Sequence, residues 1–441
     1  MSSSDTITHA RILKIAIPIM LANVAVPLIG VVDTAVVGQI PRAEPIAAVG
    51  IGAIVLSAIY WVFGFLRMGT AGLTAQAEGA GDRGEVVALL VRSLMIGGLG
   101  GLAMILLLQP ILALAFGVSP VEQEVEDLSR RYMQIRIWSA PAAVAMYGIL
   151  GWLIARERAR SVLVLQLCVT FINVGLDLLF VTGLGWGVEG VAVSSFVAEW
   201  SGLALGLWLC RNALKHPSAR DWPRIFDTSA MRRMALVNTD ILLRSLLLEA
   251  VFLSFTFYYS AGLGTVMLAA NQVLMQFIQV MAFALDGFAF AAEALVGQAF
   301  GAKAAGRLRR AAVMSSLWAF ICNFGFALGF WFGGGLIIDM ITKDPEVQSN
   351  ARLFLVWIAM TPILGLPSWM LDGIFIGATR TRDMRNMMVI SAAAYFIAVS
   401  LMLPAWGNHG LWAALMVSFV VRALTLGARY PSLERATEAE A

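Results

Sequence analysis

The chain has 441 residues, of which 59% are hydrophobic and only 13% are charged, and its net charge is +3. Soluble globular domains carry about 25% charged residues, so this composition excludes an ordinary soluble enzyme or binding module. Apolar segments long enough to cross about 30 Å of hydrocarbon recur along the whole length. We therefore expect an integral membrane protein whose partners are the lipid bilayer and a small molecule, with no nucleic acid and no organic cofactor.

The start of the chain and the cysteines fit this class. Because residues 2–9 are polar, we expect no secretory signal before the first apolar run. We expect that run to be the first span. Cys168, Cys210 and Cys322 are odd in number and lie far apart in apolar segments. This spacing favours packing thiols over a disulfide or a metal site.

Hydropathy and helix-breaking residues predict an all-α membrane protein with twelve transmembrane helices. The predicted spans are residues 11–38, 46–77, 86–115, 129–155, 160–183, 188–211, 232–260, 265–299, 308–338, 348–377, 385–404 and 408–428. Some of these spans are longer than a bilayer requires, so we expect tilt or extension into water.

Lys and Arg residues set the predicted orientation of the spans. Most of them gather in the loops on the side of both termini, as in Arg156–Arg160 and Arg307–Arg310. By the positive-inside rule, both termini are predicted to be cytoplasmic. An even number of spans follows from that orientation.

The two halves of the chain repeat one another. Three pairs of segments match in the same order: Gln76–Gly79 with Gln298–Gly301, Arg158–Arg160 with Arg380–Arg382, and Trp186–Gly190 with Trp406–Gly410. Six spans per half give both halves one orientation, so we expect two pseudo-symmetric parallel six-helix bundles, as in alternating-access transporters. We place the bundles at residues 1–211 and 232–430, with a cytoplasmic loop at 212–231 and a polar tail at 431–441.

Two carboxylates lie inside apolar spans. Asp33 lies in the first span and Asp177 in the fifth, where a charged carboxylate costs about 2.5–3.5 kcal/mol at the helix centre. Asn173 and Asp177 have i, i+4 spacing and share a helical face, and Ser195 follows in the next span. Such oxygen atoms suit Na⁺, and the same carboxylates can bind H⁺. We predict a cation-coupling site that consists of Asp33, Asn173, Asp177 and Ser195. If the ion is Na⁺, we expect Asp33, Asn173 and Asp177 to be its ligands.

A simpler interpretation is that these acids only pack helices and bond to neighbouring hydroxyl groups. We prefer ion coupling, because acids at mid-membrane depth are usually functional. The counterparts of Asp33, Asn173 and Asp177 in the second half are Phe255, Tyr395 and Val399, or in a second register Ala393 and Ile397 for the last two. Neither register supplies a carboxylate, so coupling is predicted to belong to the first half alone.

Pro18 and Pro27 lie in the same span as Asp33. Each removes a backbone hydrogen bond, so we expect this helix to be bent. A hinge that responds to protonation of Asp33 is one hypothesis. A static kink is the alternative, because proline is common in membrane helices.

A polar stripe marks the second half. Its members recur at helical spacing on one predicted span: Gln272, Gln276, Gln279, Asp286 and Glu293. Together with Asp372 and Arg244, the stripe either binds a cationic substrate or forms a salt-bridge network that neutralises Arg244. Met275 and Phe283 belong to a Met- and Phe-rich set that can adapt to varied ligands, although plain packing is the commoner role of such residues.

Several motifs, taken in order, resemble the MATE (multidrug and toxic compound extrusion) family. In the first half they are Val31–Gly38, Asn173–Asp177 and Trp186–Gly190. In the second half, Leu285–Ala302 and Leu371–Arg380 resemble the DNA-damage-inducible protein F (DinF) branch of that family. The resemblance covers the chain from the first predicted span to the twelfth.

The resemblance implies two six-helix lobes around a V-shaped cavity, and a transporter rather than an enzyme. It implies multidrug efflux across a bacterial inner membrane, by export of cationic or amphipathic compounds in exchange for H⁺ or Na⁺, and we expect a monomer. It assigns the cation-sensitive site to Asp33, Asn173 and Asp177. Ser195 stands where a threonine is more typical, which leaves its role open, and Pro18 best matches the bend in the first helix.

Three other interpretations compete with this one. The major facilitator superfamily also has twelve helices in two halves, but Gly81–Gly84 only partly resembles its loop motif, since Glu85 and Val86 replace the basic pair. A flippase for lipids or lipid-linked precursors resembles MATE proteins in fold and is the closer alternative. An intramembrane aspartyl protease also needs two acids within spans, but the duplicated architecture favours transport.

Overall fold

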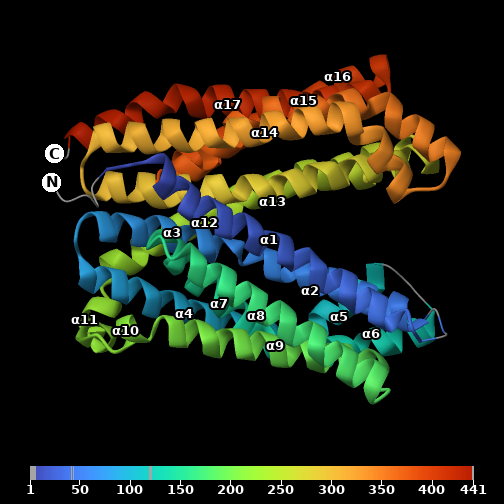
Figure 1. Cartoon of the computed structure of the whole chain (residues 1–441), viewed down its shortest axis with the longest axis horizontal. Helices are drawn as coiled ribbons and strands as arrows, with labels where there is room; N and C mark the ends of the chain where they lie inside the picture. Colours follow the sequence, from blue (N-terminus) through green and yellow to red (C-terminus); the bar gives the residue numbers. More distant parts are fainter. Residues whose placement is uncertain (1–5, 41, 43, 119–121, 440–441) are drawn as a thin grey trace. The chain divides into compact units, whose positions relative to one another are not determined.

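The computed structural model describes residues 6–40, 42, 44–118 and 122–439, and all regular structure in these ranges is helical (Figure 1). Eleven helical segments of this part are long and apolar enough to cross a membrane. A further helix, α1 (His9–Val37), has 29 residues and is also long enough to cross. A long helix thus occupies each predicted span, which confirms the expected all-α membrane fold.

The helix bounds are as follows. The first half contains α1 (His9–Val37), α2 (Glu44–Val62), α3 (Gly64–Gly79), α4 (Arg83–Leu106), α5 (Leu108–Val118), α6 (Gln123–Arg136), η1 (Ile137–Ser139), α7 (Ala140–Ala155), α8 (Ala159–Asp177), η2 (Leu178–Gly183) and α9 (Gly187–Leu209). The connection contains α10 (Arg211–Leu214), η3 (Pro217–Arg220) and α11 (Trp222–Ile225). The second half contains α12 (Thr228–Leu253), η4 (Ser254–Ser260), α13 (Thr265–Gly301), α14 (Ala305–Ile341), α15 (Pro345–Gly377), α16 (Thr381–Trp406) and α17 (Asn408–Ala439).

Some predicted spans differ in detail from these helices. The second predicted span is divided into α2 and α3, and the fifth and seventh end in the π-helical segments η2 and η4. The last helix, α17, continues through Pro431 to Ala439, so it includes most of the predicted tail at 431–441. Residues 440–441 lie outside the described residues.

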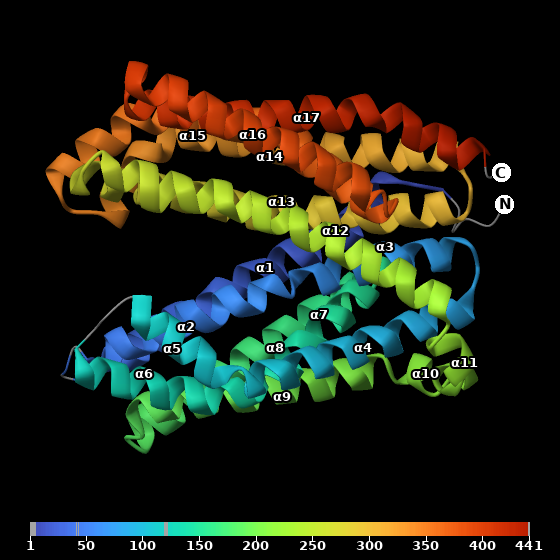
Figure 2. The same ribbon diagram turned by 180° about the vertical axis from the view of Figure 1, so that it is seen from behind.

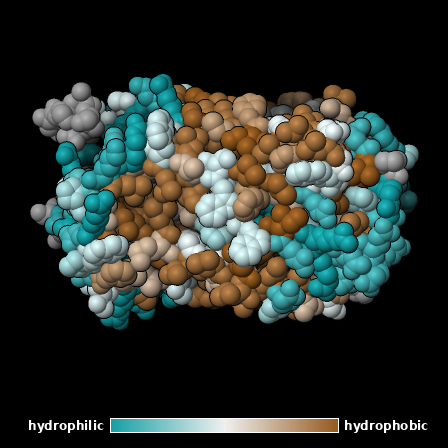
Figure 3. Space-filling model, turned by 90° about the horizontal axis from the view of Figure 1, so that it is seen from below, coloured by the Kyte–Doolittle hydropathy of each residue, from teal (hydrophilic) through white to brown (hydrophobic). Residues whose placement is uncertain are grey.

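Large apolar side chains are exposed along the helices. Leu106, Phe171 and Phe332 are 82%, 71% and 79% exposed. On the face seen in Figure 3, apolar side chains cover the middle and polar side chains gather at both ends. This pattern is that of helices surrounded by hydrocarbon, whose ends reach the polar interfaces.

The chain divides into two compact units. Unit 1 contains Met1–Met20, Ala75–Gly81 and Arg233–Ala441, and unit 2 contains Leu21–Thr74 and Asp82–Arg232. The division crosses α1 directly after Met20 and crosses α3 directly before Ala75. The first part of α1 and the last part of α3 therefore belong with the helices of the second half.

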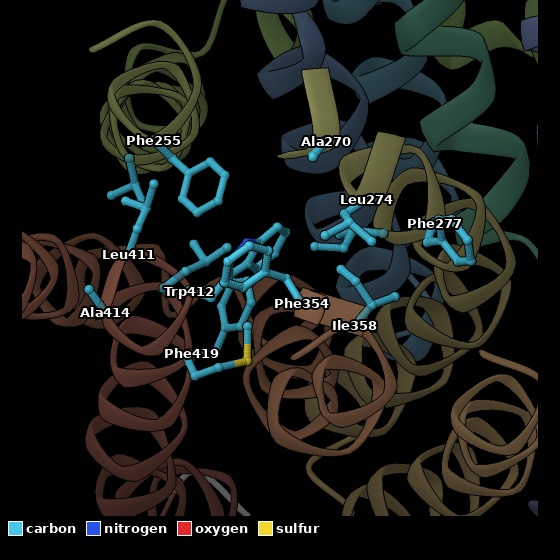
Figure 4. Packing of buried hydrophobic residues seen from close by; sticks show 14 of the residues in the cluster. Phe255, Ala270, Leu274, Phe277, Phe354, Ile358, Leu411, Trp412, Ala414 and Phe419 are labelled. Carbon is cyan, nitrogen blue, oxygen red and sulfur yellow. The ribbon is translucent and has the colours of Figure 1, made fainter. Parts of the chain in front are cut away.

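In unit 1, helices α13 to α17 lie side by side (Figures 1 and 2). Their apolar core includes Phe255, Leu274, Phe277, Phe354, Ile358, Trp412 and Phe419 (Figure 4). The rings of Phe255 and Trp412 meet edge to face with centroids 4.8 Å apart. The indole N–H of Trp412 donates a hydrogen bond of 2.9 Å to Asn271 Oδ1, so this buried donor is satisfied.

The core also decides between the two repeat registers. Phe255, Tyr395 and Val399 are fully buried and belong to the same apolar cluster. Ala393 and Ile397, the alternatives in the second register, are exposed. The buried acids of the first half therefore correspond to buried core positions of the second half, which supports the first register.

The repeat is visible as a reciprocal helix crossing within unit 1. A Cβ atom added to Gly79 on α3 would lie 1.9 Å from the carbonyl oxygen of Gln298 on α13. A Cβ atom added to Gly301 would lie 2.0 Å from the carbonyl oxygen of Gln76. Only glycine permits these backbones to approach so closely, and the two contacts are repeat-related copies of each other.

Two hydrogen bonds repeat the same symmetry at this crossing. Arg11 Nη2 donates to Gln298 Oε1 at 3.1 Å, and Arg233 Nη2 donates to Gln76 Oε1 at 2.5 Å. Each bond joins a first-half residue to a second-half residue in the register of the glycine pair. The duplicated sequence therefore produces a duplicated set of contacts, which confirms the predicted internal repeat.

In unit 2, α4 packs against α7, and α9 packs against both α6 and α8. Two glycines of α4 allow its close approach to α7, because Cβ atoms at Gly97 and Gly101 would lie 2.6 Å from Ala145 Cα and 2.3 Å from Pro141 Cα. Helices α6, α8 and α9 bring polar side chains into the interior of this unit.

Candidate cation-coupling site

The structure brings the four predicted cation-site residues together within unit 2. Asp33 lies in the last turns of α1, Asn173 and Asp177 in the last turns of α8, and Ser195 in the middle of α9. Asp33 is 7% exposed and Asp177 is completely buried. The i, i+4 spacing on α8 places the amide and the carboxylate on one face, as the sequence predicts.

The side-chain amide of Asn173 links the two acids. In the orientation that satisfies all its neighbours, the amide nitrogen donates to Asp33 Oδ1 at 3.2 Å and to Asp177 Oδ2 at 3.3 Å. The amide oxygen then accepts a hydrogen bond of 3.1 Å from the Ser195 hydroxyl group. Ser195 therefore fixes the amide with its donors directed at both carboxyl groups.

The two carboxyl groups lie on either side of one donor, because the same amide nitrogen of Asn173 bonds to both. Two carboxylates held so close together repel each other unless a proton or a cation neutralises one of them. Among the described residues, Asp177 Oδ1 is buried without a hydrogen-bond partner, so the site has an unused oxygen atom.

The orientation of the Asn173 amide bears on which ion this site can hold. The Asn173 amide presents its N–H groups to the carboxylates, whereas Na⁺ needs oxygen ligands. To ligate Na⁺, the amide would have to take the opposite orientation, in which its oxygen faces the acids and its nitrogen donates to Ser195 Oγ at 3.1 Å. Among the described residues, no cluster of three or more His, Cys, Asp or Glu side chains is placed to hold a metal ion.

A second charged pair in the interior of unit 2 was not predicted as part of the site. Arg136 at the end of α6 and Glu199 on α9 form an ion pair of 2.9 Å, with side chains 14% and 20% exposed. Hydropathy does not distinguish Arg136 from a solvated arginine near the end of a span. The signal available was helical spacing, because Glu199 follows Ser195 by one turn of α9 and lies on the same face.

A cavity of about 610 Å³ lies at one end of unit 2. Val36 and Val181 line it, and they follow Asp33 and Asp177 by about one helical turn. Both valines are almost completely buried, at 5% and 6% exposure. The wall of the cavity therefore comes within about one helical turn of each acid.

The predicted hinge residues both lie within α1. Pro18 is half-buried in the part of α1 that belongs to unit 1, and Pro27 is exposed in the part that belongs to unit 2. The boundary between the units lies directly after Met20, close to Pro18. Whether this part of α1 moves remains a prediction.

The polar stripe of the second half follows α13. Gln272 and Asp286 are half-buried, Gln276 and Gln279 are exposed, and Glu293 is 1% exposed. Met275 is half-buried against the apolar core, and Phe283 is half-buried on the same helix. The stripe thus passes from an exposed end to a buried end.

Asp372 on α15 forms an ion pair with Arg244 of α12. A second guanidinium group, that of Arg422 on α17, lies 3.7 Å from the same carboxylate. It also donates a hydrogen bond of 2.9 Å to Ser368 Oγ. Asp240, which precedes Arg244 by one turn, pairs instead with Arg385 at 2.5 Å. Asp372 therefore takes part in a salt-bridge network with Arg244, one of the two roles that the sequence leaves open.

Comparison with known proteins identifies the family. The MatE family model matches residues 18–179 and again residues 241–402, once in each half. The chain is 38% identical to DNA damage-inducible protein F of Escherichia coli (strain K12), over 94% of this chain and 90% of that protein. It is 27% identical to the Synechococcus sp. protein named "Probable multidrug resistance protein NorM", over 91% of this chain and 89% of that protein.

Solved structures show the same fold. The crystal structure of the Vibrio cholerae MATE transporter VcmN in the bent form has a TM-score of 0.86 at 18% identity, covering 98% of both chains. Three findings agree on the family. The family model matches both halves of the sequence, one relative is 38% identical, and the fold is that of a MATE transporter. The chain is therefore a membrane transporter and not an enzyme, and it belongs to the DinF branch of the MATE family.

Proposed function

We propose that this chain is a secondary active antiporter of a bacterial inner membrane, which exports cationic or amphipathic organic compounds in exchange for protons. Its termini lie in the cytoplasm, and it works as a monomer in the lipid bilayer. The observation that carries the proposal is the buried contact of Asp33, Asn173 and Asp177, in which one amide nitrogen donates to both carboxyl groups.

The acid pair has the properties of a loading site for a coupling ion. A carboxylate within the bilayer is costly when charged and much less costly when neutralised, so binding of an ion changes the free energy of the conformation that buries it. Coupling requires the ion to bind two conformations with different affinity. The cavity at Val36 and Val181 supports a route by which protons reach the acids from one end of unit 2.

The chemistry of the site makes H⁺ the proposed ion and Na⁺ the alternative outcome. The amide donors of Asn173 stabilise carboxylate charge after proton release, and in this orientation the amide offers no oxygen ligand to a metal. A sodium-coupled protein would instead turn the amide oxygen toward both acids.

The test is transport in proteoliposomes that contain the purified protein and a fluorescent organic cation such as ethidium. Gradients of H⁺ and Na⁺ are imposed separately on wild type, Asp33→Asn and Asp177→Asn. We expect a proton gradient to drive movement of the dye in wild type and neither variant to respond. Asp127→Asn, an exposed acid on α6 outside the site, is the matched control and should respond like wild type.

The outcomes separate the parts of the proposal. Movement driven only by the Na⁺ gradient would replace the proton by sodium and leave the site unchanged. Failure of both gradients to drive the wild-type protein would refute antiport. Proton-driven movement that persists in Asp33→Asn and Asp177→Asn would refute the assignment of the site.

A further inference from the structure

Two arginines and one aspartate form a buried cluster in unit 1. Arg244 of α12 and Asp372 of α15 form an ion pair, and their side chains are 8% and 7% exposed. The side chain of Arg422 on α17 is 2% exposed, and its Nη1 atom lies 3.7 Å from Asp372 Oδ2. All three residues belong to helical segments that are long and apolar enough to cross a membrane. The cluster therefore buries two positive charges and one negative charge.

Asp372 can neutralise only one of the two guanidinium groups. Among the described residues, it is the one acid whose carboxylate lies within 4 Å of either group. Asp240, which precedes Arg244 by one turn, is instead paired with Arg385 at 2.5 Å. Because arginine stays charged in proteins, one positive charge of the cluster lacks a negative partner.

Arg422 has the weaker partners of the two arginines. Its distance of 3.7 Å from Asp372 is too long for a hydrogen bond. It donates a hydrogen bond of 2.9 Å to the uncharged Ser368 Oγ and a weak one of 3.7 Å to Met388 Sδ. Among the described residues, the Nε atoms of Arg244 and Arg422 are buried without hydrogen-bond partners, as is Asp372 Oδ1. Unused donors on a buried charge are costly, so a ligand that accepts from them would stabilise the cluster.

The helix packing that the two halves share does not require these charges. In the register of the internal repeat, the three charged residues have uncharged counterparts in the first half: Ala22, Leu150 and Gly202. These counterparts are buried as well. Small or apolar residues therefore fill the same places in one half of the molecule, which favours a role in ligand binding for the charges in the other half.

The chemistry of the cluster suits an anion. A guanidinium group presents its donors in a planar fork that matches a carboxylate or another anion, and the Ser368 hydroxyl group can also donate. The excess positive charge attracts an anion and repels a cation. This balance argues against a cationic substrate at Arg244 and Asp372, the other role that the sequence leaves open for them.

We propose that Arg244 and Arg422 bind a monovalent anion, which supplies the negative charge that Asp372 alone does not provide. The anion is either a small free ion, such as chloride, or the carboxylate group of an amphipathic compound, since both bring one negative charge to the same donors. The proposal goes beyond antiport and does not depend on it, because the excess charge is a property of the fold.

The test is thermal unfolding of the full-length protein in detergent at constant sodium concentration, while the Hepes anion of the buffer is replaced by another anion. The probes are chloride, acetate and 1-naphthoate, an amphipathic carboxylate. A ligand that binds only the folded protein raises the Tm with the logarithm of its concentration. For a chain of this length we expect a rise of about 1.5 °C for each tenfold increase above the Kd.

Variants that change the number of charges test the cluster itself. Arg422→Gln leaves one arginine and one aspartate, so its Tm should not respond to the anions. Arg422→Lys keeps the charge and should keep a response. Asp372→Asn leaves two arginines without a carboxylate and should show a lower Tm in Hepes with a larger rise on adding the anion. Arg352→Gln, the matched control, removes a partly exposed arginine that pairs with Asp339 and should respond like wild type.

The wild-type response and its loss in Arg422→Gln decide the proposal. A wild-type Tm that none of the three anions changes would overturn it, whether or not the variants fold. A response that persists unchanged in Arg422→Gln would also overturn it. A response to 1-naphthoate at about tenfold lower concentration than to acetate would support the site and identify the carboxylate of an amphipathic compound as the ligand. Similar responses to chloride and acetate, without that preference, would support the site and identify a free anion.

Discussion

The glycine at position 301 tests whether the reciprocal crossing of α3 and α13 depends on the absence of side chains. In Gly301→Ala, the new Cβ atom would lie 2.0 Å from the carbonyl oxygen of Gln76 and 2.7 Å from its carbonyl carbon. Both obstructing atoms are backbone atoms, so no side chain can rotate away. The helices would have to separate by about 1 Å to reach an acceptable contact.

The magnitude follows from two opposed effects. Overpacking of this kind costs about 1–3 kcal/mol, and replacing glycine by alanine within a helix returns about 1 kcal/mol. Separation would also lengthen the bonds Arg11–Gln298 and Arg233–Gln76, so the cost lies at the upper end of its range. We expect a net destabilisation of about 2 kcal/mol, which lowers the Tm by about 2 °C for a chain of this length.

The assay is thermal unfolding of the purified protein in detergent, followed by tryptophan fluorescence. Gly79→Ala, the repeat-related change, should produce a similar loss because its Cβ atom would lie 1.9 Å from the Gln298 carbonyl oxygen. Gly325→Ala on α14 is the matched control, since that position is exposed with no atom within 4 Å. A Tm for Gly301→Ala at or above that of Gly325→Ala would refute the reasoning.

Three other predictions concern stability and use the same thermal assay. Phe255→Ala empties the centre of the unit 1 core and should cost about 3–5 kcal/mol, whereas Leu401→Ala, at a position 69% exposed, should have little effect. Asp372→Asn deprives two buried guanidinium groups of their carboxylate and should cost about 3–5 kcal/mol, and an unchanged Tm would contradict its pairing. The backbone N–H of Glu85 and the Arg224 guanidinium group lower the pKa of Asp82 below its ordinary value of 3.8. Its stabilisation is present above that value and is lost as the pH falls through the lower pKa of the folded protein, so Asp82→Asn should lower the Tm at neutral pH but not at strongly acid pH.

The spans and the acid site were accessible from sequence because each depends on local spacing. Twelve long apolar runs define the helices, and the i, i+4 spacing of Asn173 and Asp177 places them on one face. Asp33 was expected at the same site because a carboxylate buried in an apolar helix needs a polar partner. The π-helical segment η2, which begins directly after Asp177, has no comparable signal in hydropathy.

The charged partners were not accessible in the same way. Arg136 and Arg422 both stand near predicted span ends, where hydropathy cannot distinguish a solvated arginine from a buried one. Only tertiary packing shows that Arg136 meets Glu199 from another helix, and that Arg422 is 1% exposed beside Asp372. When the partner of a buried charge lies far away in the sequence, no helical spacing in the sequence indicates the pair.

Duplication followed by divergence explains why only one unit holds the acid site. The position of Asp33 in the first half is that of Phe255 in the second, where the ring packs against Trp412 in a closed apolar core. A carboxylate at 255 would lie in the apolar cluster that contains Tyr395 and Val399, where the first half has an amide and a second acid. Neither of these two residues would share its proton or pair with its charge. An acid site of this kind requires at least three polar residues, from at least two helices, to arise together. The same backbone arrangement can therefore hold an ion-loading site in one half and a rigid core in the other, and conversion between them cannot proceed through a single stable substitution.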